Sequence, residues 1–287
     1  MLLELAIGDA YGCGFEYASP NFVNEFNTLE GYVKHQTHDI PVGNYTDDAQ
    51  MSIAIAELAV EGNKWTPLNV ADKFVQVFKR DPRLGYASRF HGLLSEIESG
   101  QELLDRLKGN NQSDKSGAAM RAVPIGVYPN RATVLHHCSI QARLTHDTDD
   151  GIWAAQAAAL MSHYFLYRIG NLKDVGEYII KAVPGQWNVP YEEHVGPKGW
   201  MSVRAAITAV MKYNRLSDLL RGCIALGGDV DTVATIALGC ASHCREYIKD
   251  LPAHLVEGLE NGKYGRDYIV QLNAKLISMV KIERGLM

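Results

Sequence analysis

The chain has 287 residues, 47% of them hydrophobic and 21% charged, and its formal net charge is −5. This composition is that of an ordinary water-soluble globular protein, and the length allows one large domain or two small ones. The mild negative charge disfavours nucleic acid as a partner attracted by bulk charge, although a local basic channel stays open, and no apolar run reaches the length of a membrane span.

The cysteines and the start of the chain indicate the compartment. The five Cys are scattered, odd in number and without the spacing of a zinc finger, so we expect buried, reduced thiols. Met1 is followed directly by an apolar segment with no basic region, which disfavours a secretory signal. We therefore expect a cytoplasmic protein.

The first predicted element is a short buried helix over residues 1–10, which leads into a glycine-rich turn and Glu16. A lone Glu at the mouth of a loop is usually just solvated. Residues 17–45 show no periodicity, and we expect a long irregular connection, which in a compact domain is more often functional than not. His35 and His38 within it have the spacing of a metal-binding pair, but we favour ordinary histidines there.

Thr46-Asp47-Asp48 opens a helix of small residues that we predict over residues 48–61. One carboxylate at a helix start commonly caps the free N–H groups. A second carboxylate is largely redundant as a cap, so this helix start is also a candidate cation site. Amphipathic helices are predicted next, over residues 67–79 and 86–99.

The segment that follows the polar loop 109–115 opens with small residues, Ser116-Gly117-Ala118-Ala119. A helix that starts in this way exposes backbone N–H groups suited to a phosphate. Tight helix packing explains the alanines equally well.

A second Thr-Asp-Asp sequence, residues 148–150, follows a predicted helix over residues 132–144 and opens another that reaches about residue 168. It is a rival metal site, but Asp149 and Asp150 could equally well only favour the positive end of a helix dipole. From the residues alone the two readings are not ranked. His146, just before this helix, is either a donor to a bound anion or a structural histidine.

Residues 184–200 are rich in Pro, Gly and aromatic residues, and they suit a lid, a wall on which a base stacks, or a plug of the core. Helices are predicted over residues 201–213, 216–226, 231–247 and 264–283. Because every periodic segment is helical, we predict an all-α fold: one compact domain over residues 1–287, built from roughly a dozen helices.

The stretch 226–239 is the centre of the predicted site. Asp229, Asp231 and Thr232 follow a Gly pair and lie at the start of a buried helix. They are either helix caps or, together with Thr46, Asp47 and Asp48, the oxygen ligands of a pair of hard divalent cations.

Taken in chain order, these motifs resemble those of the ADP-ribosylglycohydrolase family, which includes the dinitrogenase reductase-activating glycohydrolase. The resemblance covers essentially the whole chain. The matching motifs are Gly8-Asp9-Ala10-Tyr11-Gly12 with Glu16, Tyr45-Thr46-Asp47-Asp48, Gly117-Ala118-Ala119-Met120-Arg121, Thr145-His146, and Gly227-Gly228-Asp229-Val230-Asp231-Thr232.

The resemblance implies a binuclear Mg²⁺ or Mn²⁺ site and hydrolysis of a glycosidic bond at C1 of the ribose in an ADP-ribosyl group. By position, the metal ligands would be Thr46, Asp47, Asp48, Asp229, Asp231 and Thr232. The catalytic group would comprise Glu16, Asp47 and Asp48, and the diphosphate would lie against Ser116, Gly117, Ala118, Ala119 and His146. The resemblance also excludes Asp149 and Asp150 as ligands.

Three positions depart from the family pattern: Ala49 where a second Thr is common, Ser116 where Asn is common, and Asp149-Asp150 where Pro is frequent. None of these removes a principal ligand, so we expect an active enzyme whose substrate is an ADP-ribosylated protein, nucleic acid or small molecule. The alternatives are an inactive ADP-ribose binder or structural protein, since a fold can outlive its activity, and a metal-dependent phosphohydrolase, which also uses paired aspartates.

Overall fold

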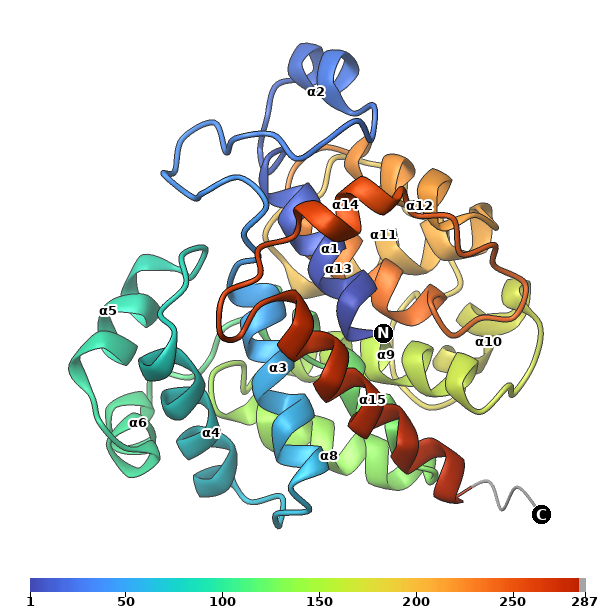
Figure 1. The fold of residues 1–287 in the computed structure, drawn as a ribbon. Helices are drawn as coiled ribbons and strands as arrows, with labels where there is room; N and C mark the ends of the chain where they lie inside the picture. Colours follow the sequence, from blue (N-terminus) through green and yellow to red (C-terminus); the bar gives the residue numbers. More distant parts are fainter. Residues whose placement is uncertain (284–287) are drawn as a thin grey trace.

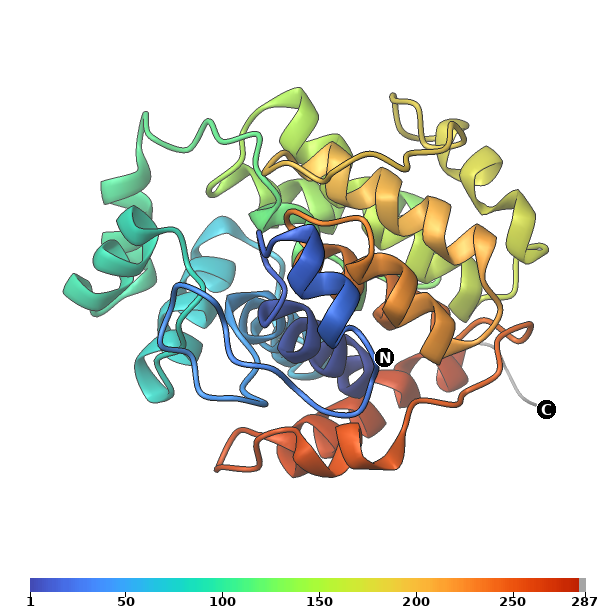
Figure 2. The same cartoon turned by 90° about the horizontal axis from the view of Figure 1, so that it is seen from above.

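In the computed structural model, which describes residues 1–283, two helices lie side by side at the centre of the molecule (Figures 1 and 2). They are α1 (Leu2–Cys13) and α13 (Val230–Ala241), and both are buried over nearly their whole length. Their backbones approach closely because α1 has glycine at the contact. A Cβ atom on Gly12 would lie 2.4 Å from the Cα atom of Asp231. The loop after α1 is thereby held beside the first turn of α13.

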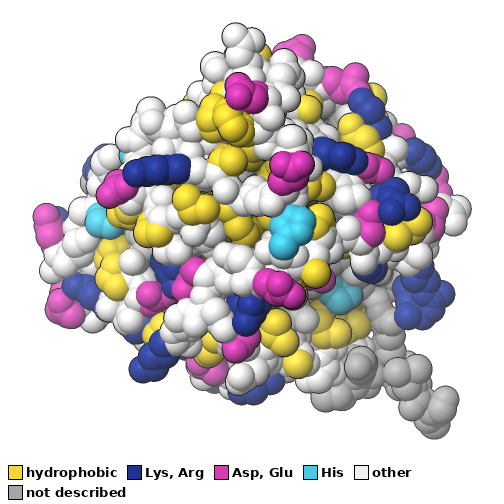
Figure 3. All heavy atoms as spheres, turned by 45° about the horizontal axis from the view of Figure 1, so that its top comes forward, with side chains coloured by type: hydrophobic (Ala, Val, Ile, Leu, Met, Phe, Trp, Pro, Cys, Tyr) yellow, Lys and Arg dark blue, Asp and Glu magenta, His cyan; other side chains and the backbone are white. Residues whose placement is uncertain are grey.

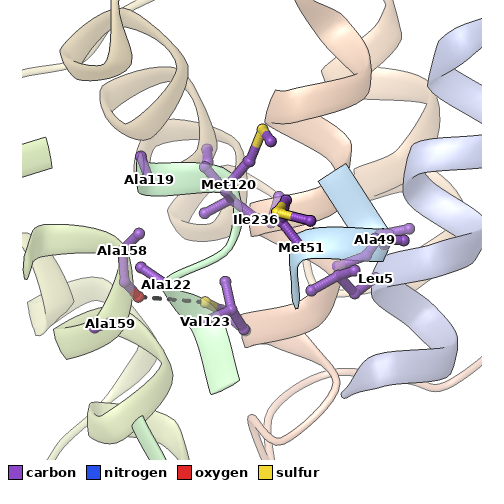
Figure 4. Packing of buried hydrophobic residues seen from close by; sticks show 14 of the residues in the cluster. Leu5, Ala49, Met51, Ala119, Met120, Ala122, Val123, Ala158, Ala159 and Ile236 are labelled. Atoms are coloured by element: carbon purple, nitrogen blue, oxygen red, sulfur yellow. Dashed lines mark hydrogen bonds between the residues drawn. The ribbon is translucent and has the colours of Figure 1, made fainter. Parts of the chain in front are cut away.

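A layer of further helices surrounds this central pair. It consists of α3 (Asp47–Val60), α7 (Gly117–Met120), the 3₁₀-helix η1 (Val123–Val127), α8 (Arg131–Arg143), α9 (Asp149–Leu166), α11 (Gly199–Lys212), α12 (Leu216–Ile224) and α15 (Arg266–Glu283). Buried side chains of α3, α7, α9 and α13 meet in one apolar core (Figure 4). Small residues such as Ala158 and Ala159 of α9 allow this dense packing, and the Cys240 thiol lies 3.8 Å from the Ala158 carbonyl oxygen.

The remaining helices lie at the periphery. Helices α4 (Pro67–Arg80), α5 (Ser88–Glu96) and α6 (Gly100–Leu107) form a lobe beside α3, at the left of Figure 1. The others are α2 (Pro20–Phe26), η2 (Leu172–Asp174), α10 (Val175–Ile180) and α14 (Ala253–Gly258). Among residues 1–283 there is no β-sheet, so the predicted all-α class is confirmed.

Several predicted boundaries were wrong, because local capping signals were missed. The connection over residues 17–45 contains α2, which begins at Pro20. Ser19 caps this helix, because its hydroxyl accepts a hydrogen bond from the Phe22 amide. The element predicted over residues 86–99 ends at Glu96, and Ser99 caps the separate helix α6. Helix α13 ends at Ala241, six residues before the predicted end.

The surface agrees with the composition. Figure 3 shows Lys and Arg side chains interspersed with Asp and Glu on the face that it presents, with no extended region of one sign. In the part of the chain that the structure describes, no helix combines the length and the apolar character needed to cross a bilayer. The five cysteines are buried and free, as expected.

Candidate active site

A cavity of about 810 Å³ opens where the loop after α1 meets the first turns of α3, α7 and α13. Its acidic side is lined by Glu16, Asp47, Asp48, Asp229 and Asp231, with the hydroxyl-bearing Thr232 beside them. The two helix starts that the sequence singled out therefore converge. Two helix starts do not need this many carboxylates as caps. The residues at the N-cap positions, Thr46 of α3 and Asp229 of α13, make no capping hydrogen bond with their side chains.

The carboxylates fit a divalent cation. One oxygen each of Glu16, Asp229 and Asp231 lies within 4.8 Å of the other two. The Oδ1 atoms of Asp48 and Asp231 are buried without a hydrogen-bond partner. A buried carboxylate oxygen without a partner is costly, and carboxylate and hydroxyl oxygens are the ligands that Mg²⁺ and Mn²⁺ prefer. The donor set therefore suits a hard cation.

The electrostatics point the same way. Burial, reinforced by the charges of the neighbouring carboxylates, raises the pKa of Asp47, Asp48 and Asp231 well above the ordinary value. For the same two reasons the pKa of Asp229 rises to about 6. Carboxylates this crowded are stable as anions only beside positive charge.

Thr46 differs from the other predicted ligands, since it does not line the cavity. Its hydroxyl donates to Asp9 Oδ1 at 2.7 Å, and its amide and that of Ala49 donate to Asp9 Oδ2 at 2.8 and 2.9 Å. Asp9 thus holds the first turn of α3 from a neighbouring helix. Although it belongs to the first sequence motif, it was given no role. An Asp in the middle of a mostly apolar, buried helix was the available signal, because a buried carboxylate needs partners.

Two further supports of the acidic cluster were missed. Ser202 of α11 donates a hydrogen bond to Asp229 Oδ2 at 3.1 Å, and nothing distinguishes it in sequence from other serines in small-residue helices. Buried His35 lies with Nε2 3.1 Å from Glu16 Oε2. Its Nδ1 accepts from the amides of Thr37 and His38, so the ring proton lies on Nε2 and is donated to Glu16.

Ser116, Gly117 and His146, which were predicted to bind an anion, also line the cavity, and the Ser116 side chain is hydrogen-bonded to the Asp229 carboxylate. Ala118 and Ala119 are fully buried and belong to the core, because α7 makes only one turn and presents its start to the cavity. Three exposed cationic residues line the cavity as well: Arg89, Arg106 and Lys115. The cavity therefore combines a cluster of carboxylates with hydrogen-bond donors and cations.

The aromatic residues of the loop 184–200 do not line this cavity, to which the loop contributes Pro197. Trp187 and Trp200 line a separate cavity of about 250 Å³, and Tyr191 is buried with its ring against that of Trp200. The expected aromatic wall for a base is not formed by these three residues. The aromatic side chains that line the main cavity are Tyr17, Tyr86 and Phe90.

The rival Thr-Asp-Asp sequence is also separate. The Thr148 hydroxyl caps α9 by accepting from the Gly151 amide at 3.1 Å, and Asp149 and Asp150 are exposed at the helix start. Neither aspartate lines the main cavity, although Asp150 lines the smaller one. The position of the Thr148-Asp149-Asp150 sequence therefore fits a helix start better than a part of the metal site.

Comparisons with known proteins agree with this geometry. The family model for ADP-ribosylglycohydrolase matches residues 1–284. ADP-ribosylhydrolase ARH3 of Xenopus tropicalis is 26% identical, and the alignment covers 84% of each chain. ADP-ribosylarginine hydrolase Tri1 of Pseudomonas putida (strain GB-1) is 24% identical and covers 82% of this chain and 67% of its own. A solved structure titled ADP-ribosylglycohydrolase-related protein complex superposes with a TM-score of 0.70 at 19% identity, covering 98% of this chain and 95% of its own, and so shows the same fold.

Proposed function

The chain belongs to the ADP-ribosylglycohydrolase family, and from this membership and the composition of its cavity we propose that it is a metal-dependent hydrolase of ADP-ribosyl groups. The bond cleaved would be the glycosidic bond at C1 of the ribose, with release of ADP-ribose from a modified protein, nucleic acid or small molecule. The observation that carries the proposal is the convergence of Asp47, Asp48, Asp229 and Asp231 in one cavity, with two of their oxygens left without partners.

The residues that would hold Mg²⁺ or Mn²⁺ are these aspartates and Thr232, with the Thr46 oxygen behind them. A divalent cation supplies Lewis acidity and lowers the pKa of a bound water. Ser202 and Asp9 would keep the ligands in place, as their hydrogen bonds to Asp229 and to the first turn of α3 indicate. The carboxylates would also favour the positive charge that develops on the ribose as the bond breaks.

Glu16 is the proposed acid–base residue. It lies at the mouth of the cavity, partly exposed, with one carboxylate oxygen close to those of Asp229 and Asp231. The hydrogen bond from His35 fixes its orientation. A carboxylate held in this way can move a proton at the reacting bond. The anionic diphosphate would lie near Ser116, Gly117 and His146.

The test is an assay of products. Purified protein is incubated with ADP-ribose linked to arginine, to serine, to a nucleic-acid base and to acetate, with Mg²⁺ or with chelator. We expect free ADP-ribose from at least one substrate, in a cation-dependent manner. AMP as the product would identify a phosphohydrolase instead. ADP-ribose binding without turnover of any substrate would identify a non-catalytic binder.

The matched variants are Asp48→Asn, in the cavity, and Asp149→Asn, at an exposed helix start outside it. Only Asp48→Asn should abolish the cation-dependent reaction. If both variants keep full activity, the acidic cluster is not the catalytic centre.

A further inference from the structure

Arg121 is a buried cation with neutral partners. It is 2% exposed and takes part in none of the ion pairs that the structure records among the described residues. Its Nε donates to the Gln141 side-chain oxygen at 2.5 Å, and its Nη2 donates to the Gln141 carbonyl at 3.1 Å and to Thr145 Oγ1 at 2.8 Å. The guanidinium also lies 4.6 Å from the centre of the Phe74 ring. A charge this buried, without a carboxylate, calls for an explanation beyond stability.

The contact with Thr145 fixes the direction of a hydrogen bond. Arginine has only donors and keeps its proton, so Thr145 Oγ1 must act as the acceptor toward Nη2. The hydroxyl proton of Thr145 is then free to point elsewhere. The His146 Nδ1 atom lies 2.7 Å from Oγ1, and no other acceptor for this hydroxyl is recorded among the described residues. The hydroxyl therefore donates to Nδ1.

This donation determines which nitrogen of His146 carries the ring proton. In a neutral imidazole one nitrogen donates and the other accepts, so an accepting Nδ1 leaves the proton on Nε2. Burial, together with the charges of Arg121 and Lys115, lowers the pKa of His146 to about 3, which agrees with a neutral ring. Nε2 lies on the Gly117 side of the ring, where it would be 3.2 Å from a Cβ at that position.

The Nε2–H group has a place to donate. His146, Thr145, Arg121 and Gly117 all line the main cavity. No acceptor for Nε2 is recorded within the part of the chain that the structure describes. A buried donor that faces a cavity without a partner is suited to a ligand oxygen.

We propose that Arg121 and Thr145 are positioning residues that hold His146 as a neutral Nε2–H donor toward an anionic ligand oxygen in the cavity. The identification of that ligand as the diphosphate of ADP-ribose rests on the proposed function above. The relay Arg121–Thr145–His146 itself does not, because it is made entirely of this chain's own groups. Its direction follows from the inability of arginine to accept a hydrogen bond.

The first experiment reads the tautomer directly, by ¹⁵N NMR of the histidine rings in the ligand-free protein, with His146→Gln to assign the signals. We expect a neutral ring with its proton on Nε2 at pH 7. Thr145→Val has nearly the shape of threonine but no hydroxyl, and it should convert His146 to a mixture of tautomers or to the Nδ1–H form. Thr145→Ser, which keeps the hydroxyl, should restore the parent spectrum.

The second experiment measures ADP-ribose affinity by calorimetry for the same variants. Loss of the oriented donor in Thr145→Val should weaken binding by about tenfold, and Thr145→Ser should bind within about twofold of the parent. If only the shape of the side chain mattered, Thr145→Val, which resembles threonine more closely in shape than Thr145→Ser does, would bind ADP-ribose at least as well. Weaker binding by Thr145→Val, together with a changed tautomer, therefore identifies the hydroxyl as the cause.

The outcomes separate the two proposals. An Nδ1–H or charged His146 in the parent, or a Val variant with unchanged tautomer, overturns the relay. An altered tautomer with unchanged affinity overturns its role in binding. If the parent does not bind ADP-ribose at all, the proposed function fails, and the ligand-free spectra still decide the relay.

Discussion

Without divalent cations, Asp231→Asn should make the folded protein more stable rather than less. The Asp231 carboxylate lies within 4.8 Å of those of Glu16 and Asp229. At that separation two unit charges repel by about 3.5 kcal/mol for an effective dielectric constant near 20. The unfolded chain separates the charges and escapes this repulsion, so the repulsion reduces the free energy of unfolding.

Proton uptake sets an upper limit on this effect. The pKa of Asp231 is raised from an ordinary 3.8 by burial and by the neighbouring carboxylates. Protonating such a group at pH 7 costs about 4 kcal/mol, so the charged form cannot reduce stability by more than that. Asparagine removes the charge but leaves a polar group in the same place. We therefore expect a gain of about 2–4 kcal/mol at pH 7, or roughly 3–7 °C in Tm.

The pH dependence has a definite sign. Because the pKa is higher in the folded state, the loss of stability in the parent grows as pH rises above the unfolded value of 3.8. The difference between Asp231→Asn and the parent should therefore shrink to below about 2 kcal/mol at pH 5. Thermal melts in chelator at pH 5 and pH 7 measure it.

Adding excess Mg²⁺ should remove most or all of the difference between the variant and the parent. Ligand bound to the native state stabilises the parent by about 3 kcal/mol at a hundred times the dissociation constant, and the variant should gain far less. Asp149→Asn, at an exposed helix start, is the matched control and should show neither effect. If the parent gains nothing from Mg²⁺ or Mn²⁺ and Asp231→Asn melts no higher in chelator, these aspartates are not a metal site.

Three further changes test other parts of the structure. Glu16→Gln should lower kcat by about ten- to ten-thousand-fold with little change in Tm, and an unchanged rate at saturating substrate removes Glu16 from the mechanism. Ser202→Ala removes the donor to Asp229 and should weaken Mg²⁺ binding in a calorimetric titration by about 10- to 100-fold; equal affinity would show that this hydrogen bond does not matter. Burial lowers the pKa of His137 to about 4, so its contribution to stability is full above pH 6.5 and is lost as pH falls toward 4. His137→Phe keeps the stacking on Trp65 but cannot be protonated. Between pH 6.5 and pH 4 the variant should therefore lose about 1–2 kcal/mol less of its free energy of unfolding than the parent, a figure already reduced for the partial exposure of His137. If thermal melts show the same pH dependence for both proteins, the lowered pKa is contradicted.

The acidic cluster could be predicted from sequence because its signal is local. Asp47 and Asp48 are consecutive at one helix start, and Asp229 and Asp231 stand one residue apart at another, so their redundancy as caps is visible without a structure. Their supports are not visible, because each is a single residue whose partner is distant in the chain. Asp9 meets Thr46 across 37 positions, and Ser202 meets Asp229 across 27.

The errors at the predicted anion site and in the aromatic loop have a different cause. The sequence predicted which residues open a short helix at Ser116, but a helix of one turn cannot present all of its residues to one cavity. Ala118 and Ala119 therefore pack inward. In the aromatic loop, composition did not distinguish a wall for a ligand from a plug of the core. Trp187 and Tyr191 bury their rings because burial of a large aromatic surface is favourable wherever it is available.

The close contact between α1 and α13 has a consequence for reading related sequences. At Gly12 the two backbones touch, so any larger side chain would push the Asp231 backbone away from Glu16. A homologue could then keep every acidic residue of the motifs and still lose the spacing between the two halves of its centre. An inventory of carboxylates is thus an incomplete criterion for an active member. The hydrogen atom that serves as the side chain of residue 12 belongs among the diagnostic features.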